Sequence, residues 1–170
     1  MRKLLGAALI IGGTAAMGFS AARGLAQRVS GLGAVIAALE LAERELSFRL
    51  TPIPELLDEL SRRAPAPAGA FFAGCLARLD RLGERSLGEL WDEAIEEQPM
   101  GLAAEDREIL SRLGRVLGRY DGGGQQEAVA LARVRLEHNL AAAEADRDSR
   151  GRLYGALGLT AGSFFAILLL

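Results

Sequence analysis

Two long uncharged runs, one at each end of the chain, most constrain what this sequence can fold into. The first covers residues 4–22 and is flanked by Arg2, Lys3 and Arg23. The second covers residues 153–170. As helices they would be roughly 27 to 29 Å long, which is close to the hydrocarbon thickness of a bilayer. The sequence therefore predicts a transmembrane helix over 4–22 and another over 153–170.

Each run also has a second interpretation. The N-terminal run has the basic start, apolar middle and small residues (Ser20 and Ala22) of a cleaved signal peptide. Its apolar stretch is longer than a usual signal core, which favours a retained anchor. The C-terminal run is an alternative candidate for a buried core helix, but only Tyr154, Thr160 and Ser163 would be available for a solvent-facing edge.

Small residues recur at four-residue spacing in both runs, and this spacing allows helix backbones to approach closely in lipid. The alternative is the ordinary tolerance of membrane helices for glycine. The candidate packing residues are Gly12, Gly151, Gly155, Gly158 and Gly162.

The basic residues flanking the runs predict an orientation, because Arg and Lys are retained on the cytoplasmic side. Those on the side of the central region are Arg23, Arg28, Arg147, Arg150 and Arg152, against Arg2 and Lys3 on the other side. This excess predicts a cytoplasmic central region with both termini outside, although the N-terminal pair argues the other way.

The composition predicts an all-α fold and excludes some functions. Half of the residues are hydrophobic, only 5% are aromatic, and Ala, Leu, Glu and Arg, which are strong helix formers, dominate. The formal net charge of -2 argues against a dedicated nucleic-acid binder. With Cys75 as the sole cysteine no internal disulfide can form, and its apolar surroundings predict a small buried hydrophobe.

Residues 24–149 are predicted to form one helical domain, because their apolar residues repeat at helical spacing. Ser86 and Glu89 have the spacing of a capping box at the start of a helix. The sixth helix can continue unbroken into the C-terminal run. The six helical patterns cover residues 32–50, 51–65, 72–79, 86–97, 103–119 and about 125–150.

The sequence offers no catalytic or cofactor motif. His138 is the single histidine and lies in no metal-ligand motif, so we expect it on the surface and expect no metal. The glycines at 122–124 are not a phosphate-binding loop, since no lysine exists beyond Lys3; a turn is the expected structure. Carboxylates are interspersed with arginines, which is typical of a solvated face. We therefore expect a protein that is not an enzyme and has no cofactor.

Several stretches together resemble a known family. They are "MRKLLGAALIIGGTAAMGF" at the start, "RLTPIPELLDEL", "EDREILSRLGRVLGRYDGGGQ" and "GRLYGALGLTAGSFFAILLL" at the end. In this order and at this length they resemble the stage III sporulation protein AB family of endospore-forming bacteria. The most specific marks are Leu113 with Gly114, Leu117 with Gly118, Asp121 and Gln125; Tyr120 departs from the small polar residue expected there.

The resemblance implies a role in the complex that joins mother cell to forespore, in the mother-cell membrane that faces the forespore. The family's soluble domain is similar to the cytoplasmic helical domain of type II secretion and type IV pilus platform proteins. A neighbouring protein of the same operon is similar to the secretion ATPase. The implied partners are the lipid bilayer, that ATPase and other membrane proteins of the channel complex, with no nucleic acid and with homo-oligomers allowed.

From these arguments we expect a membrane platform that docks the ATPase. The predicted contact residues are Asp106, Arg107, Arg115, Arg119, Asp121 and Gln125. Gly114 and Gly118 have a structural alternative, which is to allow close helix packing. A second hypothesis is a secreted or periplasmic helical binding module with a cleaved signal and a C-terminal membrane anchor. A small membrane enzyme is disfavoured, because no catalytic set is present.

Overall fold

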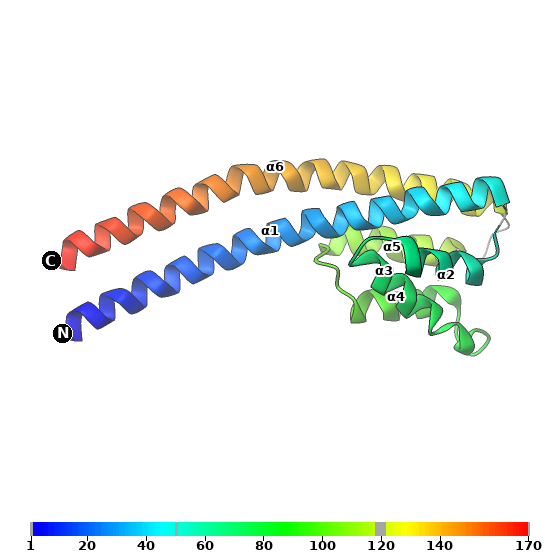
Figure 1. The fold of residues 1–170 in the computed structure, drawn as a ribbon, viewed down its shortest axis with the longest axis horizontal. Coiled ribbons are helices and arrows are strands. Elements are labelled where there is room, and N and C mark those ends of the chain that lie inside the picture. The colour runs from blue at the N-terminus through cyan, green and yellow to red at the C-terminus, as the bar shows by residue number, and fades with distance from the viewer. Residues whose placement is uncertain (1, 50, 118–121, 170) are drawn as a thin grey trace. The chain divides into compact units, whose positions relative to one another are not determined.

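The computed structural model describes the backbone of residues 2–49, 51–117 and 122–169, and the side chains of residues 20–48, 51–117 and 124–150. In these residues the chain is helical with no β-strand, which confirms the all-α expectation (Figure 1). The elements are α1 (Arg2–Arg49), α2 (Ile53–Arg63), α3 (Ala68–Leu76), the 3-10 helix η1 (Leu79–Arg81), α4 (Leu87–Glu97), α5 (Ala104–Leu117) and α6 (Gly122–Leu169).

The first and last helices are far longer than the other four. The sequence predicts a separate N-terminal span and first domain helix, but α1 is one continuous helix that no proline interrupts. The sixth helix continues through the C-terminal run, as expected. It starts earlier than predicted: residues 122–124 form its first turn, so the expected turn at these glycines is wrong.

The chain divides into two compact units. One comprises Met1–Ala26 and Ala142–Leu170, and the other comprises Gln27–Ala141. In the second unit, the four short helices gather against the C-terminal half of α1 (Figure 1). Hydrogen bonds join α1 to α6: Gln126 Nε2 donates to Ser47 Oγ at 2.6 Å, and Arg133 Nε donates to Glu43 Oε1 at 2.8 Å.

An aromatic cluster forms the centre of the short-helix bundle. Phe71 and Phe72 of α3 meet Trp91 of α4 edge to face, with ring centroids 5.1 and 5.9 Å apart. All three side chains are buried. Trp91 lies directly against α5, because a Cβ placed on Gly114 would be 2.4 Å from Trp91 Cγ. The predicted structural role of Gly114 in close helix packing is therefore confirmed, while Gly118 lies outside the described residues.

The C-terminal half of α1 contributes to the same core. Ser20–Phe48 is the one stretch, among residues with described side chains, that is long and apolar enough to cross a membrane, and the mean hydropathy of an 18-residue window within it is 1.3. Leu32, Val35 and Leu39 within it are buried in the domain. We assign this half of α1 to the domain core, since burial in protein accounts for its apolar residues.

The third helix is shorter than its pattern predicts. Leu79, expected on this helix, lies instead in η1. The Arg78 N–H donates to the Cys75 carbonyl at 3.2 Å. This bond spans three residues, as in a 3-10 helix, so the turn is tighter than an α-helical one. Arg78 Nη1 also donates to the Gly74 carbonyl at 2.6 Å, which satisfies one of the open carbonyls at the end of α3.

Candidate interaction surface

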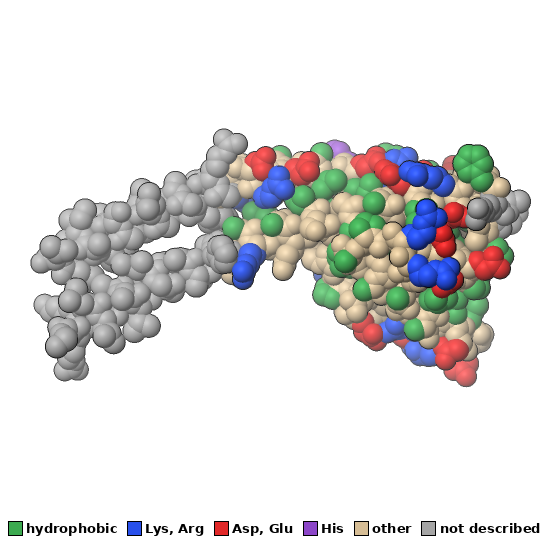
Figure 2. Space-filling model, in the orientation of Figure 1, with side chains coloured by type: hydrophobic (Ala, Val, Ile, Leu, Met, Phe, Trp, Pro, Cys, Tyr) green, Lys and Arg blue, Asp and Glu red, His purple; other side chains and the backbone are tan. Residues whose placement is uncertain are grey.

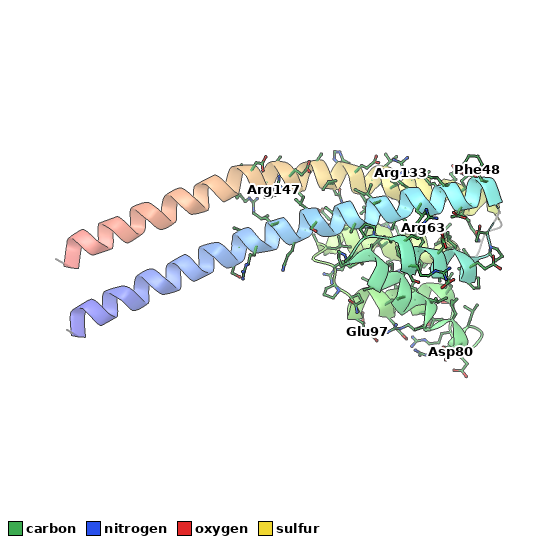
Figure 3. All side chains as sticks on the ribbon, viewed as in Figure 1. Phe48, Arg63, Asp80, Glu97, Arg133 and Arg147 are labelled. Carbon is green, nitrogen blue, oxygen red and sulfur yellow. The ribbon has the colours of Figure 1, made fainter. Side chains whose placement is uncertain are left out.

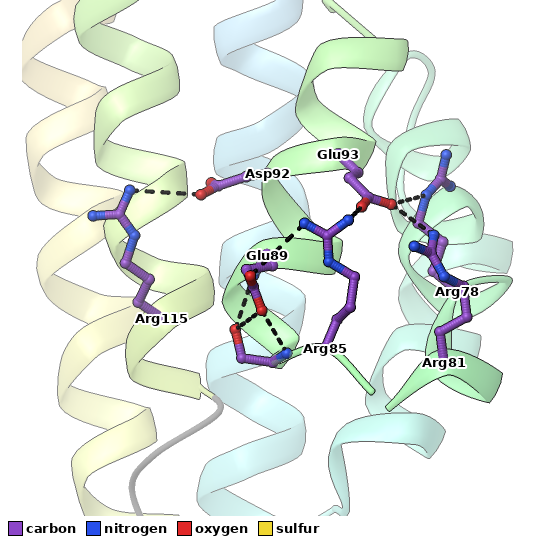
Figure 4. Close-up of polar contacts among 8 residues, drawn as sticks. Arg78, Arg81, Arg85, Glu89, Asp92, Glu93 and Arg115 are labelled. Atoms are coloured by element: carbon purple, nitrogen blue, oxygen red, sulfur yellow. Dashed lines mark hydrogen bonds and ion pairs between the residues drawn. The ribbon is translucent and has the colours of Figure 1, made fainter. Parts of the chain in front are cut away.

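Arginines before α4 converge on one carboxylate of that helix. Arg81 Nη1 donates to Glu93 Oε2 at 2.8 Å, and Arg85 pairs with Glu93 Oε1 (Figure 4). Arg78 Nε lies 3.8 Å from Glu93 Oε2, and the same guanidinium pairs with Glu97. These contacts hold the η1 segment against α4, and they leave guanidinium edges at the surface.

The start of α4 is fixed by a capping box, as its sequence predicts. The Glu89 N–H donates to Ser86 Oγ at 3.3 Å, and the Ser86 N–H donates to Glu89 Oε2 at 2.8 Å. The bond from the Ser86 backbone and the bond from its hydroxyl hold the pKa of Glu89 below its ordinary value. The ionised carboxylate also suits the positive end of the helix dipole.

Arg115, a predicted contact residue, lies on α5 beside α4. Its Nη2 donates to Ser111 Oγ at 2.7 Å. The same atom lies 3.5 Å from Asp92 Oδ2 (Figure 4). The two helices approach closely here, because a Cβ on Gly88 would lie 2.8 Å from Arg115 Cγ. The side chain remains exposed at the surface formed by α4 and α5.

Asp106 is not on an exposed face, so this part of the predicted contact surface is wrong. Its side chain is 0% exposed. Arg28 Nε of α1 donates to Asp106 Oδ2 at 2.8 Å, and Asn139 Nδ2 of α6 donates to Oδ1 at 2.8 Å. The Ala103 N–H also donates to Oδ2, at 2.9 Å. Asp106 thus joins three helices of the second unit.

These bonds set the charge of Asp106. Burial alone would raise the pKa of its carboxyl, but the hydrogen bonds from Arg28, Asn139 and the Ala103 N–H together hold the pKa below its ordinary value. The carboxylate therefore stays ionised beside the Arg28 guanidinium. Sequence reasoning missed Arg28 and Asn139 as partners, because they are 78 and 33 residues away along the chain. The sequence held only a local signal. The carboxylate of an acid at the third position of a helix often accepts a hydrogen bond from the backbone N–H of the residue before that helix.

The other predicted contact residues fall into three groups. Arg107 is exposed on α5. Gln125 Nε2 donates to the Leu117 carbonyl at 3.2 Å, which caps the end of α5. Arg119 and Asp121 lie outside the described residues. The glycines predicted to pack in the membrane lie in helices. Side-chain contacts around them lie outside the described part, so their packing role stays a prediction. These glycines are Gly12, Gly151, Gly155, Gly158 and Gly162.

Cys75 and His138, both in the second unit, have different surroundings. Burial raises the pKa of the Cys75 thiol to about 12, against a small opposing effect of Arg78. Cys75 is buried, which confirms its assignment as a core residue. His138 is exposed, as expected. Among the described residues, no group of three His, Cys, Asp or Glu side chains is placed to hold a metal ion.

On the face of the second unit that Figure 2 shows, charged side chains of both signs are closely mixed. Fold and surface together define the class: an all-α domain continuous with two long terminal helices, with an ion-paired surface at α4 and α5. The model of the family "Stage III sporulation protein AB" matches residues 3–170. The chain therefore belongs to the stage III sporulation protein AB family.

Two relatives support this assignment. The chain is 28% identical over 172 residues to the stage III sporulation protein AB of Bacillus subtilis (strain 168), and the match covers 100% of both chains. It is also similar to a solved structure of a stage III sporulation protein AB, with a TM-score of 0.62 and 25% identity. That match covers 72% of this chain and 98% of the solved one. The chain is thus one of the sporulation proteins.

Proposed function

We propose that this protein is a non-enzymatic platform in the complex between mother cell and forespore, and that it docks a cytoplasmic motor ATPase. The observation that carries the proposal is helix continuity. The uncharged run 4–22 is part of α1, which goes on to form the domain core. The run 153–170 is reached by α6, which supplies Val129 and Leu136 to that core.

This continuity suits a platform, because a helix without a break transmits force and displacement along its axis. The membrane spans over 4–22 and 153–170 belong to the proposal. Their length and lack of charge support it. The membrane that we propose for both spans is the mother-cell membrane that faces the forespore.

The docking face we propose is the α4–α5 surface, defined by Arg107 and Arg115 on α5 with Asp92 on α4. Arginine is favoured at protein interfaces, since its planar guanidinium can bind a carboxylate through two hydrogen bonds. Arg115 already lies 3.5 Å from Asp92, so its side chain is partly oriented before any partner binds. Asp106 and Gln125 are left out of this face, because their bonds hold the domain together.

Charge reversal tests this face. Arg115→Glu should weaken co-purification of the cognate secretion-type ATPase by about tenfold or more, because like charges across an interface are costly. The matched control is Arg44→Glu, since Arg44 is also an exposed helix arginine and also lies beside an acid, Glu40. Unchanged ATPase binding by a folded Arg115→Glu variant would exclude the α4–α5 surface as the docking face.

A further inference from the structure

A second surface lies on the other side of α5, between α5 and α6. Two adjoining hollows, of about 580 and 80 Å³, share Ile109, Arg112 and Arg135 in their linings, so they form one groove. From Glu105 to Val116 the groove follows α5 for roughly 17 Å, at ~1.5 Å per residue. That length corresponds to about three turns of a helix.

Exposed apolar side chains line this groove. Leu131 is 50% exposed and Val134 is 54% exposed, and both belong to α6. They are three residues apart, so they lie on one side of the helix. Ile109 faces them from α5, and all three line the groove. Apolar side chains at this spacing, between two helices, are the arrangement that receives the apolar face of another helix.

The charge of the groove points to an acidic partner. Arg112 Nε pairs with Glu108 Oε1 at 2.9 Å, and Glu105 pairs with Arg28. Those charges compensate one another. Arg135 is exposed, and in the described part of the chain no hydrogen bond or ion pair involves it. The groove therefore presents one uncompensated cation beside Leu131 and Val134.

We propose that the α5–α6 groove binds an amphipathic helix of another protein, whose apolar stripe covers Leu131 and Val134 and whose carboxylate pairs with Arg135. The partner is recognised by chemistry: about three helical turns, with apolar residues at i, i+3 or i+4 and i+7 and an acid beside them. This surface is separate from the α4–α5 face, so the proposal does not depend on ATPase docking.

Site-specific photocrosslinking tests the groove. A photoreactive benzoyl-phenylalanine replaces Leu131 in the full-length chain, expressed as the sole copy in sporulating cells. The adducted peptide is then identified by mass spectrometry. We expect a segment from another protein with a helical apolar stripe and an acidic residue. The same group at Arg44, on exposed α1 surface, is the control and should not form this adduct.

Two variants sharpen the test. Val134→Asp should lower the adduct yield by about tenfold, because the apolar contact is lost. Arg135→Glu should lower it by about twofold to fivefold, as expected for one solvent-exposed ion pair. Both residues are exposed, so the domain should remain folded. An adduct to a second copy of this chain, an adduct to a basic or non-helical segment, yields unaffected by both variants, or no adduct at Leu131 would each overturn the proposal.

Discussion

At the residue scale, Asp106 determines how the second unit is held together. It is a buried carboxylate that accepts hydrogen bonds from α1, from α6 and from the segment before α5. Arg28 is one fifth exposed, so the pair is only partly shielded from solvent. Removing the charge from one partner of such a pair leaves the other poorly compensated, which costs more than the pair itself contributes.

Asp106→Asn should therefore lower the free energy of unfolding by about 2–4 kcal/mol at pH 7. The folded pKa of Asp106 is lowered, so its stabilising contribution is complete above the ordinary carboxyl pKa of 3.8 and is lost as the pH falls through the folded value. Urea unfolding of the full-length protein in detergent should show a constant difference in stability between the two proteins above about pH 4, and the two stabilities should converge as the pH is lowered further.

The control for this prediction is Glu108→Gln. Glu108 is on the same helix and pairs with Arg112, but its side chain is about half exposed. An exposed pair of this kind contributes little to stability, so Glu108→Gln should change the free energy of unfolding much less than Asp106→Asn does. A difference between wild type and Asp106→Asn that stays constant across the acid range would contradict the assigned role of the Asp106 charge.

At the element scale, close packing between α4 and α5 is the feature most sensitive to a single methyl group. Gly114 faces the Trp91 ring, which is held in turn by Phe71 and Phe72. The ring has little room to move, because its cluster is buried. Glycine is required here for the approach of two helices, not for a special backbone angle.

Gly114→Ala should lower the free energy of unfolding by about 3 kcal/mol, because the new methyl overlaps the Trp91 ring. Gly33→Ala on α1 is the matched control, since a Cβ there meets nothing within 4 Å. In a helix interior that change should be stabilising by about 0.5–1 kcal/mol. Thermal unfolding measures both, and equal effects of the two substitutions would show that the α4–α5 contact is not tight.

Much of the helical organisation was predictable from local patterns. The capping box at Ser86 and the core position of Cys75 follow from spacing and apolar neighbours, and the structure confirms both. The continuity of α1 was missed. The charges near Arg23 limit the length of a membrane span, but they do not end a helix. The burial of Asp106 was also missed, because it depends on tertiary contacts with Arg28 and Asn139.

At the scale of the whole molecule, α1 and α6 each contain both a helix of the domain and one of the uncharged terminal runs. Phe48 marks the C-terminal end of α1, where it is exposed, and Arg133 lies on the domain part of α6 (Figure 3). A platform of this design would pass a movement of its docking face to the membrane without a flexible linker. This is the central claim of the proposed function, and it requires the domain to be cytoplasmic.

Cysteine accessibility tests most directly whether this protein is a membrane platform with a cytoplasmic domain. Cys75 is buried and the pKa of its thiol is about 12, so it should react little with maleimides. A new cysteine at exposed Glu96 (Glu96→Cys) reports the side on which the domain lies. In protoplasts expressing the full-length chain, we predict that membrane-impermeant maleimide labels this cysteine only after permeabilisation, in protein that remains with the membrane after alkaline carbonate extraction. Labelling of intact protoplasts, or release of the protein by carbonate, would contradict a membrane platform with a cytoplasmic domain.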